Sequence, residues 1–543
     1  MSRRAARAAA ALVALLLLAR LATLGLPPLF DATEGRYAEI GREMLGSGDW
    51  ITPTLHGGEP FWAKPPLHFW MTALSLRAFG VNEWAARFPG FLSGLGILAL
   101  TMIAARRLYG GRAALLAGSI LGSSGLFALL VGTVILDVTF TCTVTGALVC
   151  YLLFRKDPSR RWPGLLLFLF LGLGLLAKGP IALVLAGLPV FFDVIRARKL
   201  GAVRRLPWVA GIGLLLLVAV PWYVLAERKT PGFWNYFFLH EHFLRYVRAE
   251  YGDRYGHGHV SPYGLIWALG LLGFLPWTPA AVGAAIRRFR PHATTGAGDP
   301  SEEEGTAFLW LWALSPLLFF TFSRSLSLPY VFPAFPPLAI LLGREAAGEG
   351  GIPARRVGLA VPLFLLVAGT VYGLARFSGR PAEGAALLLP LLLAGGAALF
   401  AFRRGGSAAA ILSGSLLFPL FLIALSVAVP GAVEEGKSTR HLARATAPLG
   451  GEPLFFDGVP PSAEFYFRGR AVNLRGEVGE ILRRFEDGGG DLLLLREKQE
   501  RYLSSTMIAA LEPLRRTGDY VIYRIVGTPE REAATTAAER KEK

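Results

Sequence analysis

The sequence has few cysteines and few charged residues. Only two of its 543 residues are cysteines, Cys142 and Cys150, and both lie in one apolar segment. This excludes a disulfide framework and a cysteine-based metal site, and it favours two small core residues. Charged residues make up 17% of the chain, against 53% hydrophobic residues and a mean hydropathy of +0.46. The composition excludes an ordinary soluble protein and predicts a polytopic α-helical membrane protein.

Acidic residues are also in the minority, and the formal net charge is +17. In a soluble protein such an excess would suggest nucleic acid as a partner. Here the Lys and Arg residues lie between apolar runs, so we interpret them as topology signals and contacts to membrane lipids. No nucleic-acid partner is predicted.

The apolar runs predict about thirteen transmembrane helices. They lie near 8–27, 85–105, 113–131, 139–154, 163–177, 181–195, 206–226, 263–285, 306–322, 329–343, 357–375, 385–402 and 408–429. No convincing small-residue cleavage site follows the first run, so we expect it to be retained as a signal anchor. No repeat indicates inverted transporter halves.

The loops between these runs alternate in charge, which predicts their sidedness. Loops assigned to the cytoplasm are rich in arginine, for example at 106–112, 155–161, 196–205 and 287–290. Loops assigned to the outer side carry few basic residues. Loop 28–84, the Asp137 turn, the Lys178 turn, loop 227–262 and the Arg324 turn therefore share the extracytoplasmic face.

The first outer loop, 28–84, is far longer than a connection between helices requires. It predicts a built surface beside a functional site. Within it, 37–45 forms a candidate helix, and 67–80 is an apolar segment that suits a helix lying in the membrane interface.

After Pro430 the composition changes. Short apolar strands are predicted at 453–457, 471–475, 491–495 and 520–526, with helices at 477–486 and 497–512. The predicted domains are a transmembrane part (1–430), a small extracytoplasmic α/β domain (431–527) and a disordered tail (528–543).

Three acids are candidates for catalysis. Asp31 and Glu34 open the first loop, where a carboxylate can act as a base, bind a metal or cap the following helix. Asp137 lies between two apolar spans with no basic residue in its turn. An acid in that place either caps the next span or has a function.

Several polar residues could bind a phosphate. Lys64 precedes two prolines that fix the backbone, and Lys178 ends a span in AKGP, where it could instead snorkel. Arg324 and Tyr330 flank a proline-rich span and could be interface anchors. In the segment 237–246, Glu241 and His242 could ligate a divalent metal and Arg245 could clamp a phosphate, unless the segment is only an amphipathic interfacial helix.

Read together, these motifs resemble a known family. DATEGRYAEIGREMLGSGDWITPTLHG, KPPLHFW, LDVTF, AKGP, EHFLRY and LPYVFPAFPPLAILLG follow one another over residues 10–430. They resemble the bacterial lipid-carrier-dependent glycosyltransferases, and among them the aminoarabinose (lipid A) transferases, which share the protein mannosyltransferase (GT-C) fold.

The resemblance implies roles by position. Asp31 or Glu34 would be the first-loop acid and Asp137 the second, Lys64 and Lys178 would bind phosphate, and His242 would take the place of a metal-binding histidine. Arg245 and Tyr330 fall near donor-phosphate contacts. The chain departs from the pattern at Thr33, where the family has Asp, and at Ala63, where the family has an acid that helps to hold a metal.

The predicted function is transfer of a sugar from a polyprenyl-phosphate donor to lipid A, another glycan or a protein, at the outer face of the bacterial inner membrane. Asp31 or Glu34 would take the acceptor proton or orient the acceptor, assisted by Asp137. The competing class is a transporter or lipid flippase, which would need polar groups near the midplane of several spans. A scaffold protein would not require this collection of Asp, Lys and His.

Overall fold

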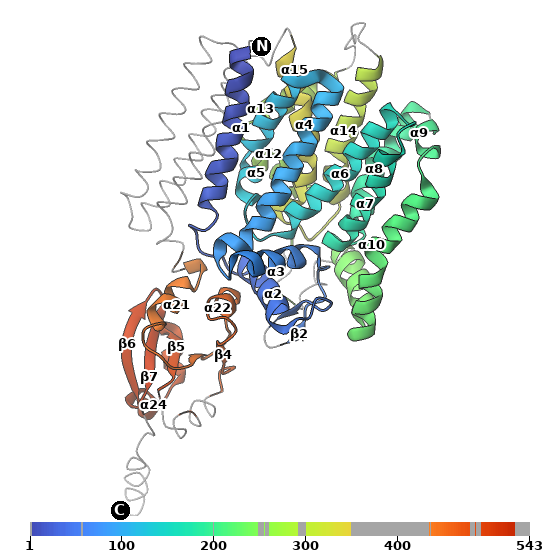
Figure 1. Cartoon of the computed structure of the whole chain (residues 1–543). Helices are drawn as coiled ribbons and strands as arrows, with labels where there is room; N and C mark the ends of the chain where they lie inside the picture. The colour runs from blue at the N-terminus through green and yellow to red at the C-terminus, as the bar shows by residue number, and fades with distance from the viewer. Residues whose placement is uncertain are drawn as a thin grey trace, which may run out of the picture. The chain divides into compact units, whose positions relative to one another are not determined.

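The structure is a computed structural model that describes residues 3–55, 58–198, 200–247, 255, 260–290, 300–348, 434, 436–477, 484 and 490–526. Contacts between Cα atoms divide the chain into two units (Figure 1). The first contains Met1–Leu26, Gly48–Pro53 and Pro60–Ala428. The second contains Pro27–Ser47, Thr54–Glu59 and Val429–Lys543.

The described part of the first unit is helical. It contains α1 (Arg3–Thr23), α3 (Leu67–Phe79), α4 (Glu83–Gly122), α5 (Gly125–Leu130), α6 (Leu136–Lys156), α7 (Arg161–Lys178), α8 (Ile181–Ala197), α9 (Gly201–Arg204) and α10 (Trp208–Lys229). These are followed by the π-helix η1 (Asn235–Leu244), α11 (Arg245–Val247), α12 (Leu265–Gly273), α13 (Thr278–Arg288), α14 (Pro300–Phe320), the 3-10 helix η2 (Leu328–Ala334) and α15 (Phe335–Ala347).

Four of the described helices, α4, α6, α7 and α10, are long and apolar enough to cross a membrane. They pack as α4 on α6, α6 on α7 and α7 on α10, and α15 lies along α4. The close packing of α15 on α4 requires glycine at position 343, because a Cβ there would lie 2.6 Å from the carbonyl oxygen of Ala113. The three predicted spans at 357–375, 385–402 and 408–429 lie outside the described residues.

Three predicted spans differ in shape from the expectation. The segment 263–285 forms two short helices, α12 and α13, because Pro276 lacks the N–H that a continuous helix needs. The span 85–105 and the first part of 113–131 are joined in α4, where Gly110 has a positive φ of 85° and marks the kink between them. The rest of 113–131 contains the separate helix α5. The arginines predicted to form a loop there, Arg106 and Arg112, flank this kink.

The second unit contains a mixed five-stranded sheet with the order β4-β3-β5-β7-β6. The strands are β3 (Pro453–Phe455), β4 (Val472–Asn473), β5 (Leu492–Arg496), β6 (Leu511–Thr517) and β7 (Tyr520–Ile525). β3 pairs in parallel with β4 and β5, whereas β7 is antiparallel to β5 and β6. Four strands lie in the predicted segments, but β6 was not predicted, since 497–512 was interpreted as a helix. That segment holds only η3 (Glu497–Tyr502) and α24 (Ser505–Ala509) before β6 begins.

The first part of the outer loop belongs to this second unit, which the sequence did not indicate. Its helix α2 (Thr33–Ser47) packs against α22 (Pro461–Tyr466), and α21 (Arg440–Thr446) also contacts α22. The α2–α22 contact is close, because a Cβ on Gly35 would lie 2.7 Å from the backbone nitrogen of Ser462. Short strands β1 (Thr54–Leu55) and β2 (Glu59–Pro60) pair later in the same loop.

Candidate functional site

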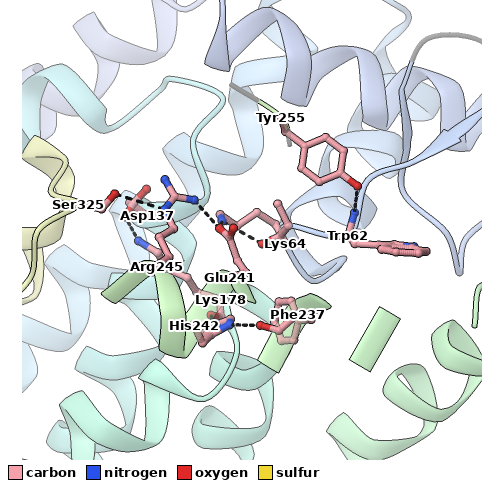
Figure 2. Close-up of polar contacts among 11 residues, drawn as sticks. Trp62, Lys64, Asp137, Lys178, Phe237, Glu241, His242, Arg245, Tyr255 and Ser325 are labelled. Carbon is pink, nitrogen blue, oxygen red and sulfur yellow. Dashed lines mark hydrogen bonds and ion pairs between the residues drawn. The ribbon is translucent and has the colours of Figure 1, made fainter. Parts of the chain in front are cut away.

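A cavity of ≈ 290 Å³ in the first unit gathers most of the predicted phosphate-binding residues. That volume is at the lower end of the range for small-molecule sites. Its polar lining includes residues from four places in the chain: Lys64, Lys178, Glu241, His242, Arg245 and Tyr330. Most of these side chains converge in Figure 2, which also shows Asp137 beside them. The cavity is the strongest structural support for a site at the predicted positions.

Lys64 reaches the cavity from the second half of the first outer loop. Trp62, two residues before Lys64, is fixed by the Tyr255 hydroxyl, which accepts a hydrogen bond from the Trp62 N–H (3.2 Å) and donates one to the Pro60 carbonyl (2.7 Å). The indole of Trp62 also donates to Thr230 Oγ1 (3.2 Å). Two prolines follow Lys64 and lead directly into α3. The lysine is therefore held at both ends, as the sequence predicts for a stiff segment.

Glu241 and Arg245 come from η1 and the turn that follows it. Glu241 Oε1 forms an ion pair with Lys64 and another with Arg245, the latter at 2.6 Å. Arg245 Nε also donates to Ser325 Oγ at 3.3 Å. Burial by itself would raise the pKa of Glu241, but Lys64 and Arg245 outweigh it and hold that pKa below its ordinary value. Burial lowers the pKa of Lys64, and Glu241 opposes that effect.

Asp137 and Lys178 form a second ion pair at the cavity. Asp137 lies in the first turn of α6, and Lys178 is the last residue of α7. The ammonium of Lys178 also lies 4.1 Å from the centre of the Tyr330 ring, a cation–π contact. Asp137 has no basic residue in its own turn, and the structure shows that its partner comes from the next helix.

His242 and its surroundings do not fit a divalent metal. Nδ1 lies 2.7 Å from the carbonyl oxygen of Phe237 and Nε2 lies 3.0 Å from that of Lys178, so both ring nitrogens face backbone acceptors. One oxygen of Glu241 already contacts two cations, and Ala63 offers no ligand. Burial lowers the pKa of His242 and favours the neutral ring. Among the described residues no group of three or more potential metal ligands is found.

Arg324 differs from the other predicted phosphate contacts. Its guanidinium lies 5.2 Å from the Tyr263 ring centre, and its carbonyl accepts a hydrogen bond from Ser261 N–H at 2.8 Å. It is not among the described residues that line the cavity, whereas its neighbour Ser325 is. The predicted turn therefore reaches the cavity through Ser325 and not through Arg324, which the sequence pattern could not tell.

Asp31 and Glu34 lie in the second unit, and their contacts are described within that unit. The Asp31 carboxylate accepts hydrogen bonds from the backbone N–H and the hydroxyl of Ser462, both at 2.6 Å. Burial raises the pKa of Asp31, and the two bonds from Ser462 oppose this. Glu34 is buried in the first turn of α2 and accepts a hydrogen bond from Phe30 N–H at 3.1 Å.

The structure adds residues that the sequence did not single out. Aromatic and aliphatic side chains line the cavity beside the cations: Ile181, Phe243, Tyr246, Phe319 and Phe320. His68 is fully buried, with Nδ1 2.9 Å from Thr139 Oγ1, which in turn lies 3.0 Å from Ser93 Oγ. These residues come from separate helices, and no spacing in the sequence signals that they meet.

The chain matches the family model described as dolichyl-phosphate-mannose-protein mannosyltransferase over residues 9–237. With its helical membrane fold and cation-lined cavity, it is an integral membrane glycosyltransferase that depends on a polyprenyl-phosphate-linked sugar. A transporter or flippase function is not supported.

The chain belongs to the family of undecaprenyl phosphate-α-4-amino-4-deoxy-L-arabinose arabinosyl transferases. It is 31% identical to the member from Aeromonas hydrophila over 481 residues, 85% of each chain. The member from Aeromonas salmonicida is 35% identical over 331 residues, which are 60% of this chain and 57% of that relative. The predicted resemblance is thereby confirmed.

The fold is similar to that of a solved structure, ArnT from Cupriavidus metallidurans bound to undecaprenyl phosphate. The TM-score is 0.79, over 96% of this chain and 98% of that chain, at 24% sequence identity. This match confirms the predicted fold class, a helical GT-C membrane fold.

Proposed function

We propose that the chain transfers 4-amino-4-deoxy-L-arabinose from undecaprenyl phosphate to lipid A, another glycan or a protein at the outer face of the bacterial inner membrane. One observation carries this proposal: Lys64, Lys178 and Arg245 meet at one cavity whose remaining lining is largely apolar. A phosphate needs cationic donors, and a prenyl chain needs apolar walls. The named relatives supply the sugar and the carrier.

The cations would act on the leaving group. As the bond between the sugar and the phosphate oxygen breaks, negative charge develops on the lipid phosphate, and fixed cations in a site of low dielectric constant stabilise it. Glu241 bridges Lys64 and Arg245. Lys178 and Tyr330 complete the lining, and Arg324 is proposed only as a more distant contact.

An acid would take the proton of the acceptor. We propose Asp31 or Glu34 for this role, with Asp137 assisting; general-base catalysis of this kind contributes about 10²–10⁴-fold. The raised pKa of Asp31 supports it, because a base titrating closer to neutral pH accepts a proton more readily. We propose further that no metal is needed, because both ring nitrogens of His242 face carbonyl oxygens and Glu241 Oε1 is paired with Lys64 and Arg245.

The finer architecture is also proposed. It comprises about thirteen spans in a transmembrane domain (1–430) and an extracytoplasmic α/β domain (431–527); the predicted tail, 528–543, lies outside the described residues. The mixed sheet of the second unit supports the α/β domain. The arginine-rich loops support a cytoplasmic side opposite the cavity.

The direct test is transfer by the purified protein in lipid nanodiscs, supplied with radiolabelled undecaprenyl-phosphate sugars and lipid A. We expect label to reach lipid A from the aminoarabinose donor, and less label from hexose donors. Mass spectrometry of envelope glycolipids from a deletion strain would identify the acceptor in cells. Failure to transfer any sugar, or preference for a hexose, would contradict the proposed donor.

A further inference from the structure

Glu241 is an anion placed among the groups proposed to bind the donor phosphate. Its Oε1 contacts both Lys64 and Arg245 (Figure 2). Its Oε2 is buried and has no hydrogen-bond partner among the described residues. The Glu241 side chain is only 4% exposed, so water screens its charge weakly. A site built only to hold phosphate would gain affinity without this carboxylate.

The carboxylate sets the charge of the site. Lys64, Lys178 and Arg245 contribute three positive charges, and Asp137 and Glu241 contribute two negative ones. His242 is counted as neutral because burial lowers its pKa. The described charged residues of the cavity therefore sum to one positive charge. Without Glu241 they would sum to two.

The reaction changes the charge of the bound lipid. The donor is a phosphodiester with one negative charge. When the sugar–oxygen bond breaks, the phosphate oxygen keeps the electron pair, the acceptor oxygen bonds to the sugar, and the acceptor proton goes to the base. The product is a lipid phosphomonoester, which carries about 1.5 to 2 negative charges at neutral pH. The site therefore matches the donor more closely than the product.

We propose that Glu241 is a positioning residue that tunes Lys64 and Arg245 to the charge of the donor and thereby promotes release of the lipid phosphate product. This inference rests on the proposed function. It predicts that removing the Glu241 charge strengthens the binding of a monoester more than that of a diester. Both ligands gain from the extra positive charge, but the gain in binding free energy scales with ligand charge.

The test measures binding of two soluble probes, farnesyl phosphate and its methyl diester, to the purified full chain in nanodiscs without acceptor. For Glu241→Gln we expect the ratio of monoester to diester affinity to rise about ten- to a hundredfold, from Coulomb attraction at an intermediate dielectric constant. Steady-state turnover should fall more than the rate of a single turnover, because product release becomes slower.

The matched control is Glu241→Asp, which keeps the charge and should keep the ratio near that of the wild type. A role limited to holding the fold would change both probes equally in both variants and would overturn the inference. If Glu241→Gln does not fold, Arg245→Gln is the second variant, because it brings the charge sum of the cavity to zero. We expect it to lower the ratio of monoester to diester affinity, and an unchanged ratio would also overturn the inference. Wild-type protein that binds neither probe would instead contradict the proposed function, and the inference with it.

Discussion

The charged residues of this cavity form ion pairs with residues far away in the sequence. Their chemistry could therefore be predicted only in part. The sequence placed Lys64, Lys178 and Arg245 on one face, and the structure brings all three to one cavity. It could not show that Glu241 lies between two of them or that Asp137 bonds to Lys178. These partners are 177 and 41 residues apart, and no local pattern links them.

Loss of one cavity cation should impair the reaction strongly. We expect Lys64→Gln and Arg245→Gln each to lower kcat/KM about 10²–10³-fold, the usual cost of removing one group that stabilises a developing oxyanion. The control is Lys229→Gln, which breaks a half-exposed pair with Asp49 (2.7 Å) outside the described cavity lining. Its effect should stay small, since exposed pairs contribute about 0–1 kcal/mol. Equal effects of Lys64→Gln and Lys229→Gln in a transfer assay would refute the role of Lys64.

The pH profile should show which first-loop acid is the base. A base works only when deprotonated, so kcat/KM should fall as the pH drops through its pKa. Because burial raises the pKa of Asp31, the acid limb should lie above the ordinary value of 3.8. Asp31→Asn should abolish most activity and remove this limb, whereas Glu34→Gln should leave the limb in place. The opposite pattern would assign the base to Glu34.

Removing metal ions should not impair the enzyme. Both nitrogens of His242 face carbonyl oxygens, and a cation at Glu241 would lie against Lys64 and Arg245. We therefore expect the same turnover before and after dialysis against a chelator, with the metal content measured in parallel. A loss of activity that Zn²⁺ or Mg²⁺ restores would show that this view of the site is wrong.

At the scale of helices, the cavity depends on where chain segments end. α7 ends at Lys178, and the next residue, Gly179, has a φ of 81°. A Cβ at Gly179 would lie 2.7 Å from both His242 Nε2 and Phe237 Cζ. The glycine in AKGP is thus needed both for the turn and for the close approach of η1. The sequence showed the motif, but not the helix that packs against it.

Gly179→Ala should therefore destabilise the fold and misplace Lys178. We expect a loss of about 1–3 kcal/mol, the cost of a strained left-handed residue with an added clash. The comparison is Gly187→Ala in α8, where a Cβ meets nothing within 4 Å and should be neutral or mildly stabilising. Thermal unfolding in detergent, followed by the transfer assay, measures both effects. Similar melting temperatures for the two variants would contradict the packing argument.

At the scale of the whole molecule, charge and hydropathy predicted the fold class, but not how the chain is divided. The apolar runs and arginine-rich ends gave the helical membrane fold, since both reflect the cost of placing charge in lipid. The sequence did not show that Pro27–Ser47 belongs with Val429–Lys543, because the contact between Gly35 and Ser462 joins residues far apart in the chain. The strand β6 was missed for a similar reason, since its partner β7 fixes it more than its own composition does.

The proposed reaction depends on the orientation of the chain in the membrane, with the first loop on the outer side. Because the chain has only two cysteines, this orientation can be tested by cysteine labelling. Replacing Cys142 and Cys150 leaves a background without thiols, into which single cysteines can be placed. Ser47→Cys lies at an exposed position in the first outer loop, and Ser159→Cys lies at an exposed position in the loop between α6 and α7. A membrane-impermeant maleimide added to spheroplasts should label the Ser47→Cys variant at once. It should label the Ser159→Cys variant only after the membrane is opened, because Arg155, Lys156, Arg160 and Arg161 keep that loop in the cytoplasm. The reverse order of labelling would place the first loop on the cytoplasmic side and rule out transfer at the outer face.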